Sequence, residues 1–369
     1  MKGYTGSISF DDIHVRPLAE RKNLIYLEQQ IKNPESPAPG CSDELMLLID
    51  ECASLIVSAR KQGFPVLLMF GAHLIRNGAG LIINNLIEGG FISHIAGNGA
   101  CAIHDWEFAY QGMTTESVKD NVRLGDFGTW DDTGRTFALA LLSGGIKGTG
   151  FGDAIGQCIA TDGIDVPSAS KLEEDIRNAP GSQISGAEAD LLYAIKKFGI
   201  REGRVQINHP WKNYSVFGCA WSKGIPVTVH PGLGYDIFTL HPMYSGAAVG
   251  RAAAIDFLKI VETIIRLDGG VVISIGSAIM APQVFEKAVS FANNIRRSQN
   301  KGPLKDFSIF VVDIQPASWD WTRGEPPKSN PAYFLRFCKS FSRMGGLMKY
   351  VCLDNVVFMH NLYHAIKKK

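Results

Sequence analysis

Short apolar runs alternate along the chain with longer segments in which apolar residues recur every three or four positions. A short continuous apolar run is typical of a strand buried on both faces, and the second pattern is typical of a helix with one buried face. The strand-like runs are 65–71, 91–97, 225–232, 269–276 and 307–314. The helical segments are 42–62, 78–90, 101–112, 252–267 and 282–297. This alternation predicts an open, doubly wound α/β fold with a mostly parallel sheet and helices on both faces, Rossmann-like.

Proline, glycine and capping residues set the expected boundaries. Residues 1–42 end in KNPESPAPG, which predicts an irregular N-terminal segment ahead of one α/β domain over 43–369. Ser42 is the expected N-cap of the first helix, and Gly63 is expected to follow its end.

Two stretches in the middle of the chain are less regular. The glycine-rich segment 141–157 predicts a mobile loop in preference to a second backbone cradle before a helix at Asp153. The sequence SGAE, 185–188, predicts a capping box that opens the next helix.

Charge, hydropathy and cysteine content limit the expected binding partners and cellular compartment. The 369 residues carry a formal net charge of +1, so no general field attracts nucleic acid or an anionic membrane. No stretch reaches the roughly eighteen uninterrupted apolar residues that a membrane span needs. Seven cysteines without a C-x-x-C pair argue against a disulfide framework and favour the cytoplasm.

The sequence IAGNGACAIHDWE, 95–107, contains the spacing G-x-G-x-x-A in Gly97, Gly99 and Ala102. It follows a predicted strand and opens a predicted helix, where dinucleotide-binding folds bring backbone close to a pyrophosphate. The acidic residue that binds the ribose in such folds is not evident about twenty residues later. Asp105 falls in the first turn of this helix, where capping is favoured over catalysis.

Ligands of such folds bind beyond the carboxyl ends of the strands, so the loops after the strands are the expected site. Four of these loops are rich in polar and aromatic residues: 71–78, 97–105, 230–241 and 314–331. The histidines are scattered and no pair has metal-ligand spacing, so no metal site is expected.

The segment 329–346 reads as a helix with Asn330 as N-cap and Pro331 at its first position. Its expected buried stripe is Phe334, Phe337, Cys338 and Phe341. Lys339 stands one step from this stripe. An amine at such an edge is either desolvated enough to form a Schiff base or, as spacing alone favours, an ordinary surface lysine.

Several of these segments together resemble the deoxyhypusine synthase family, over about 65–360. The segments that carry the resemblance are GAHLIRNG, GNGACAIHD, YSVFGCAWSKGIPV, YDIFTLH and PAYFLRFCK. The resemblance places Lys339 on the family's nucleophilic lysine, with His104 beside the catalytic groups. It implies NAD contacts by Gly71, Ala72, His73, Leu74, Gly97, Asn98, Gly99, Asp320 and Asp354. It implies a cationic-substrate site formed by Asp236, Phe337, Trp319 and Trp321.

The chemistry implied by the resemblance is NAD-dependent aminobutyl transfer from a polyamine such as spermidine through a lysine imine. The acceptor is a small amine, as in homospermidine formation, or a protein lysine, and the family's assembly is a homotetramer. This sequence departs from the family where its active-site histidine falls on Ala281 and one polyamine-binding glutamate falls on Ile103. Two alternatives therefore stay open: an NAD-dependent amine or alcohol oxidoreductase with His104 as base, and a non-catalytic binding protein.

Overall fold

The computed structural model describes residues 6–316 and 318–369. Its centre is a six-stranded sheet in which every neighbouring pair of strands is parallel. The strands are β2 (Val66–Phe70), β3 (His94–Gly97), β7 (Val227–Val229), β8 (Val271–Ile275), β9 (Ser308–Asp313) and β10 (Leu347–Cys352). The predicted α/β fold class is confirmed.

The order of the strands is β10-β9-β8-β2-β3-β7. Within this sheet, β2 is the first strand in the sequence, and β3 and then β7 follow on one side of it. The chain then returns to the other side of β2 with β8, β9 and β10. This is the strand order of dinucleotide-binding folds, and the direction of winding reverses between β2 and β8. A crevice at the carboxyl ends of these two strands is where such folds bind their ligands.

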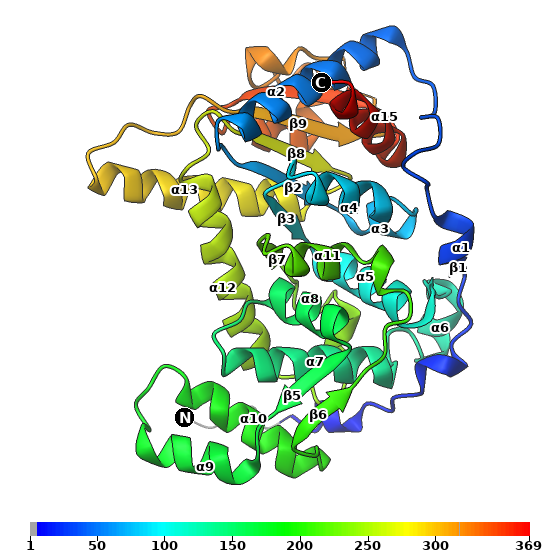
Figure 1. The fold of residues 1–369 in the computed structure, drawn as a ribbon, viewed down its shortest axis with the longest axis vertical. Helices are drawn as coiled ribbons and strands as arrows, with labels where there is room; N and C mark the ends of the chain where they lie inside the picture. Colours follow the sequence, from blue (N-terminus) through cyan, green and yellow to red (C-terminus); the bar gives the residue numbers. More distant parts are fainter. Residues whose placement is uncertain (1–5, 317) are drawn as a thin grey trace.

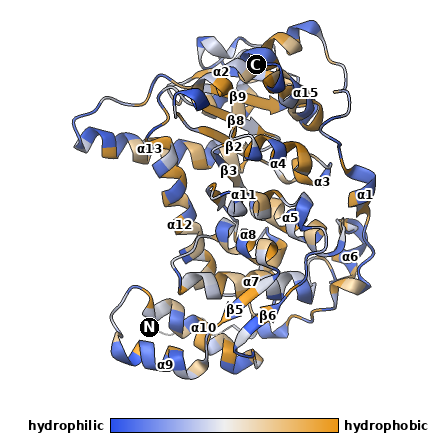
Figure 2. Ribbon diagram, in the orientation of Figure 1, coloured by the Kyte–Doolittle hydropathy of each residue, from blue (hydrophilic) through white to orange (hydrophobic). Residues whose placement is uncertain are grey.

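Successive side chains of a strand point to opposite faces of the sheet, so alternate residues pack into two separate hydrophobic cores. Leu68 and Phe70 of β2 belong to the core that includes α2 (Asp43–Lys61) and α15 (Asn355–Lys367). Leu67 and Met69 belong to the core that includes α12 (Gly246–Ile264) and α13 (Met280–Ser298). In Figure 1, α2 and α15 lie together at the end of the molecule that holds β9, and α12 runs from the sheet toward α7. In Figure 2, apolar residues concentrate on the strands and polar residues on the outer helices.

The remaining helices precede or follow these strands or lie in the segment between β3 and β7. They are α1 (Leu27–Gln30), α3 (Ala72–Arg76), α4 (Gly80–Glu88), α5 (Gly99–Gln111), α6 (Val118–Leu124), α7 (Asp131–Gly145), α8 (Phe151–Thr161), α9 (Ala169–Asn178), α10 (Ser185–Phe198), α11 (Val216–Ser222) and α14 (Arg336–Phe341). Two small antiparallel sheets pair β1 (Ile25–Tyr26) with β4 (Met113–Thr114), and β5 (Gly163–Val166) with β6 (Gly203–Gln206).

Residues 6–42 contain only short elements, and they pack on the rest of the chain. Leu18 and Leu27 are buried in the same core as β2, and β1 pairs with β4 beyond α5. Ser42 accepts a hydrogen bond from the backbone of Leu45 and caps α2, as predicted. No helix in 6–316 or 318–369 is long and apolar enough to cross a membrane.

The prediction of a mobile loop over 141–157 is wrong. The segment forms the end of α7, a short turn and the start of α8, and Leu141 to Gly145 are buried. A side chain at Gly150 would overlap Asp256, and one at Gly152 would overlap the backbone of Val227. These glycines therefore permit close packing between elements.

Two expected helix starts also differ. Ser185 does not cap α10, because its hydroxyl donates to the carbonyls of Pro180 and Ser182. The segment 329–346 is a 3₁₀ turn over Pro331–Phe334 followed by α14, since the backbone leaves the helical region at Leu335. Asn330 caps the turn as predicted, but Phe334 is 73% exposed and does not belong to the buried stripe.

Candidate functional site

A pocket of about 240 Å³ with a largely apolar lining and several ionisable side chains lies between α3, α5, α6 and the loop that follows β7. Its charged or ionisable lining residues are Arg21, Arg76, His104, Glu107, Glu116, Tyr235 and Asp236. This volume suits a small molecule and is too small for a whole dinucleotide. The pocket unites His104 and Asp236, two of the residues singled out in the sequence.

His104 lies at one end of a chain of buried hydrogen bonds. Its Nδ1 is 2.7 Å from the hydroxyl oxygen of Thr114, and that hydroxyl is 2.6 Å from the Glu107 carboxylate. Arg21 donates two hydrogen bonds of 2.7 Å to Glu107, and both side chains are about 1% exposed. Burial lowers the pKa of His104 to about 4, so the ring is neutral at neutral pH.

Asp236 lies over the amino end of α5. A side chain at Gly99 would overlap its carboxylate, which accepts a hydrogen bond of 2.8 Å from the Gly232 backbone. Burial raises the pKa of Asp236 to about 6, and the bond from Gly232 opposes this shift. At neutral pH the pocket therefore contains a carboxylate that can receive a cation.

Arg76 supplies a cation on another wall of the pocket. In the part of the chain that the structure describes, no carboxylate pairs with its guanidinium, and its Nε is buried without a hydrogen-bond partner. An unpaired guanidinium in a pocket is suited to two-point binding of a carboxylate.

Thr115 lines the same pocket and has an unusual backbone conformation. Its φ of 68° lies in the left-handed region, which β-branched residues rarely adopt. Its hydroxyl is buried and lacks a partner among the described residues. A strained residue with a free polar group in a pocket is typical of a functional site.

The carboxyl ends of β2 and β8 meet beside this region. A side chain at Gly71 would overlap the carbonyl of Gly276, and one at Gly276 would overlap the side chain of Asn355. The Oδ1 atom of Asn355 is buried and has no partner within 6–316 or 318–369. Ile279 and Ile314, in the loops after β8 and β9, are 69% and 68% exposed. The strand ends at the switch of winding thus carry a buried polar atom without a partner and, in the loops that follow, exposed apolar side chains.

The residues expected to contact NAD are distributed unevenly around this edge. Gly71 and Ala72 open α3 at the crevice, His73 is exposed, and Leu74 is buried in the core. Asp354 lies after β10, where it caps α15 by accepting from the backbones of Val356 and Val357.

The glycines of the G-x-G-x-x-A turn have explanations within the fold. A side chain at Gly97 would crowd Cys101, and Gly99 is covered by Asp236. Asn98 caps α5 by accepting a hydrogen bond of 3.0 Å from the Cys101 backbone. This turn follows β3, whereas the phosphate turn of dinucleotide-binding folds follows the first strand, here β2. Contact of the turn with a cofactor stays a prediction.

Lys339 does not line the pocket of His104 and Asp236. Its Nζ lies 3.6 Å from the centre of the Tyr333 ring and 3.9 Å from the Glu325 carboxylate. Both contacts hold a charged ammonium group. In Figure 1 the orange segment that follows β9 is at the top of the view, while α5 and α6 lie lower and to the right.

The other residues of the expected amine site accompany Lys339. Trp321 and Phe337 are buried, and the indole N–H of Trp319 donates to the carbonyl of Gly324. Asp320 is exposed and caps a 3₁₀ turn by accepting from Thr322. None of these residues lines the pocket that contains Asp236, with which the resemblance had grouped them.

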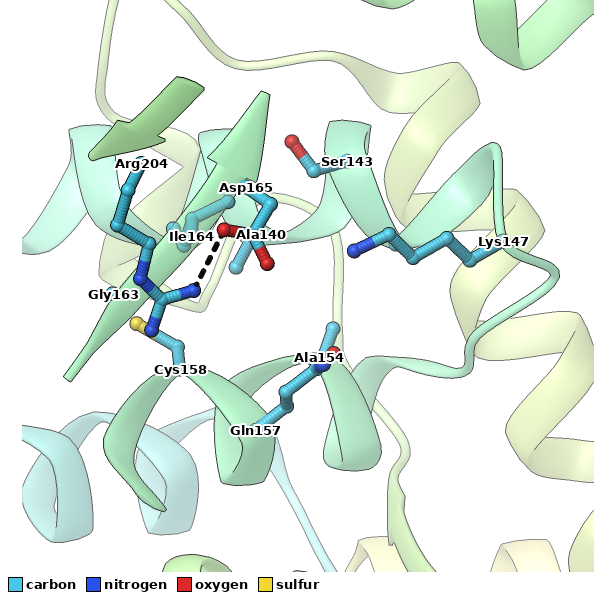
Figure 3. A pocket seen from close by; sticks show the side chains of 11 residues that line it. Ala140, Ser143, Lys147, Ala154, Gln157, Cys158, Gly163, Ile164, Asp165 and Arg204 are labelled. Carbon is cyan, nitrogen blue, oxygen red and sulfur yellow. Dashed lines mark hydrogen bonds and ion pairs between the residues drawn. The ribbon is translucent and has the colours of Figure 1, made fainter. Parts of the chain in front are cut away.

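A second cavity lies among α7, α8 and the two-stranded sheet of β5 and β6 (Figure 3). Its volume of about 20 Å³ holds about one water molecule. Ser143, Lys147 and Arg204 line it, and Arg204 donates to Asp165 at 3.1 Å. The glycine-rich segment therefore borders a water-sized cavity. No group of three His, Cys, Asp or Glu side chains in the described part of the chain is arranged to hold a metal ion.

Comparison with models of protein families gives no match, and neither does comparison with curated protein sequences. Among solved structures, the apo arginine dihydrolase ArgZ from the ornithine–ammonia cycle in Cyanobacteria is 14% identical, with a TM-score of 0.43 over 87% of this chain and 33% of that one. AgrE in complex with ornithine and NAD⁺ is 16% identical, with a TM-score of 0.42 over 89% and 34%. A conserved LOR/SDH protein from Methanococcus maripaludis S2 is 13% identical, with a TM-score of 0.44 over 96% and 75%. This chain spans about a third of the length of ArgZ and AgrE.

These structures correct the expected family. They are arginine dihydrolase-like and LOR/SDH-like proteins, so the assignment to the deoxyhypusine synthases is wrong. The polyamine donor, the protein lysine acceptor and the tetramer followed from that assignment and lose their basis with it. Its error has a physical source: glycines at strand ends recur throughout parallel α/β folds, and the match around Lys339 rested on the length of the segment.

Sequence reasoning missed Arg76, Thr114, Thr115 and the Arg21–Glu107 pair. Arg76 lies inside the loop 71–78, which was singled out, so its charge was a usable signal. Arg21 and Glu107 are 86 residues apart, and no local pattern joins them.

Proposed function

We propose that this protein is an NAD-dependent enzyme that acts on an amino acid or a closely related amine bound in the pocket of Arg76, His104 and Asp236. The observation that carries the proposal is the combination of an unpaired cation, a carboxylate and a neutral histidine in one small pocket. An α-amino acid presents the complementary groups, a carboxylate and an ammonium.

NAD would bind at the carboxyl ends of β2, β8 and β9, where the direction of winding reverses. Gly71, Gly276 and Asn355 would hold it, with Ile279 and Ile314 as apolar surface. The buried Oδ1 of Asn355 without a partner fits an amide or hydroxyl donor of the cofactor. NAD would supply a hydride acceptor. The AgrE complex contains the same two classes of ligand, ornithine and NAD⁺; the proposal rests on the residues of this pocket.

Each of the three pocket residues has its own role in the proposed reaction. Arg76 binds the substrate carboxylate and Asp236 binds the ammonium group, which fixes the carbon that bears the nitrogen. His104 accepts a proton from the ammonium, and the nitrogen lone pair forms the C=N bond as a hydride leaves that carbon. For an ammonium substrate and NAD⁺, the products would be an iminium, NADH and one proton, and His104 would take that proton.

Isothermal titration calorimetry with NAD and with a panel of amino acids and diamines tests the proposal. Arg76→Ala is expected to weaken binding of an amino acid about 10- to 100-fold, because a charge-assisted hydrogen-bonding pair is lost. Binding of NAD and of diamines is expected to stay unchanged. Arg123→Ala, an exposed arginine of α6 outside the pocket lining, is the matched control. A protein that binds neither NAD nor any amino acid overturns the proposal, and one that binds the amino acid but never NAD is a binding protein.

A further inference from the structure

We infer that Thr114 and Glu107 are positioning residues that hold His104 in the tautomer with the proton on Nδ1, so that Nε2 is the proton acceptor in the pocket. This inference rests on the proposed function for its catalytic meaning. The tautomer itself follows from the hydrogen bonds alone.

The guanidinium of Arg21 has five N–H donors and no acceptor. Its two hydrogen bonds of 2.7 Å require that both oxygens of Glu107 accept, so Glu107 is a carboxylate. A carboxylate has no proton to give. The hydroxyl of Thr114, 2.6 Å from Oε2 of Glu107, must therefore be the donor in that bond.

A hydroxyl carries one hydrogen, so Thr114 has only a lone pair for His104. The bond of 2.7 Å between the Thr114 hydroxyl and Nδ1 of His104 then requires an N–H on Nδ1. In a neutral ring the other nitrogen, Nε2, carries the free lone pair. Among the described residues, Nε2 has no hydrogen-bond partner, and His104 lines the pocket.

Thr114 is held firmly in this position. It is fully buried, and its strand β4 pairs with β1, where Ile25 is its partner. The carbonyl of the next residue, Thr115, accepts a hydrogen bond of 2.8 Å from the Leu24 backbone. The N-terminal segment thus contributes both Arg21 and the strand that fixes Thr114, and it sets the orientation of a ring in the domain.

The groups that face His104 come from several elements. Glu107 lies on the same helix, Arg76 and His73 on α3, and Arg21 on the N-terminal segment. Asp236 and Glu116 line the same pocket. Glu107 raises the pKa of His104, whereas burial and the cations lower it. Loss of the Thr114 hydroxyl changes none of these charges, so its effect reports on the tautomer.

Long-range ¹⁵N–¹H correlation NMR of ¹⁵N-histidine protein tests the inference, with His104→Gln used to assign the resonance. The expected result is the Nδ1–H pattern for His104 in the wild-type protein. Thr114→Val is expected to yield a mixture or the Nε2–H form, and Thr114→Ser is expected to restore the wild-type pattern. An Nε2–H ring in the wild-type protein, or an unchanged ring in Thr114→Val, overturns the inference.

Activity supplies a second and separate readout. Thr114→Val is expected to lower kcat for NADH formation about 10- to 100-fold with little change in KM, and Thr114→Ser to recover it. If Thr114→Val keeps the full kcat, Thr114 does not position a catalytic base. If the wild-type protein shows the expected tautomer but no NADH formation with any substrate, the proposed function fails while the positioning of the ring stands.

Discussion

The carboxylate of Asp236 lies directly against the backbone of Gly99, at the first helical position of α5. Asp236 belongs to the loop after β7 and Gly99 to the turn after β3, so this contact joins two neighbouring strand ends. It also brings a buried carboxylate into the same pocket as His104, one turn further along α5.

Gly99→Ala is expected to destabilise the protein by about 1–3 kcal/mol, because the new methyl group overlaps the Asp236 carboxylate. Urea unfolding measures the change. The control is Gly250→Ala in α12, where nothing lies near the new methyl group and helix propensity stabilises by about 0.5–1 kcal/mol. Equal effects of the two substitutions would show that Asp236 does not occupy the space beside Gly99.

Arg21→Met is expected to cost about 3–5 kcal/mol of unfolding free energy, since it leaves the Glu107 carboxylate buried without its ionic partner. The exposed pair of Lys171 and Asp175 supplies the control, and Lys171→Ala is expected to cost less than about 1 kcal/mol. Chemical denaturation of both variants measures these changes in the free energy of unfolding. A small loss for Arg21→Met would mean that the N-terminal segment does not close the pocket.

The pattern of apolar residues predicted the central strands of the sheet but not the edge strand β10. Strands β2, β3 and β8 were predicted because helices cover both of their faces and the runs are continuously apolar. Strand β10 was missed because it is an edge strand in which exposed and half-buried residues, such as Lys349, interrupt the apolar run.

The site was predictable only in part, for a similar reason. His104 and Asp236 lie in loops that follow strands, so the position of the loops pointed to them. The residues that give His104 its chemistry are Thr114, Glu107 and Arg21, and pairings between separate segments bring them together. The spacing of Lys339 favoured an ordinary surface lysine, and only the resemblance made it the nucleophile. In the structure the helix is broken at Leu335 and the amine of Lys339 contacts Tyr333.

His94 is expected to make stability depend on pH. Both of its ring nitrogens bond to threonine hydroxyls, at 2.7 and 3.1 Å, and burial lowers its pKa to about 3 from an ordinary value of 6.5. The folded state therefore binds its proton more weakly than the unfolded state does. The stability that this neutral ring contributes is present above pH 6.5 and is lost as the pH falls toward 3. Unfolding free energies measured across this range are expected to fall less steeply in His94→Gln than in the wild-type protein, and parallel curves would contradict the assignment.

Lys339→Ala is expected to retain NAD-dependent activity within about threefold, because Lys339 lies outside the pocket lining and pairs with Glu325. Steady-state kinetics on an active substrate measure this, with Lys328→Ala as a control for loss of a nearby charge. If Lys339→Ala alone loses about 100-fold or more of the activity, the lysine takes part in the reaction. That result would contradict the proposed roles of Arg76, His104 and Asp236.

The most direct measurement is the formation of NADH when the protein is mixed with NAD⁺ and a panel of amino acids, diamines and simple alcohols. NADH is expected only with compounds that carry both an amine and a carboxylate, and its rate of formation is expected to decrease about 100-fold or more in His104→Ala. NADH formation that persists in His104→Ala, or that requires no carboxylate on the substrate, would contradict the proposed function.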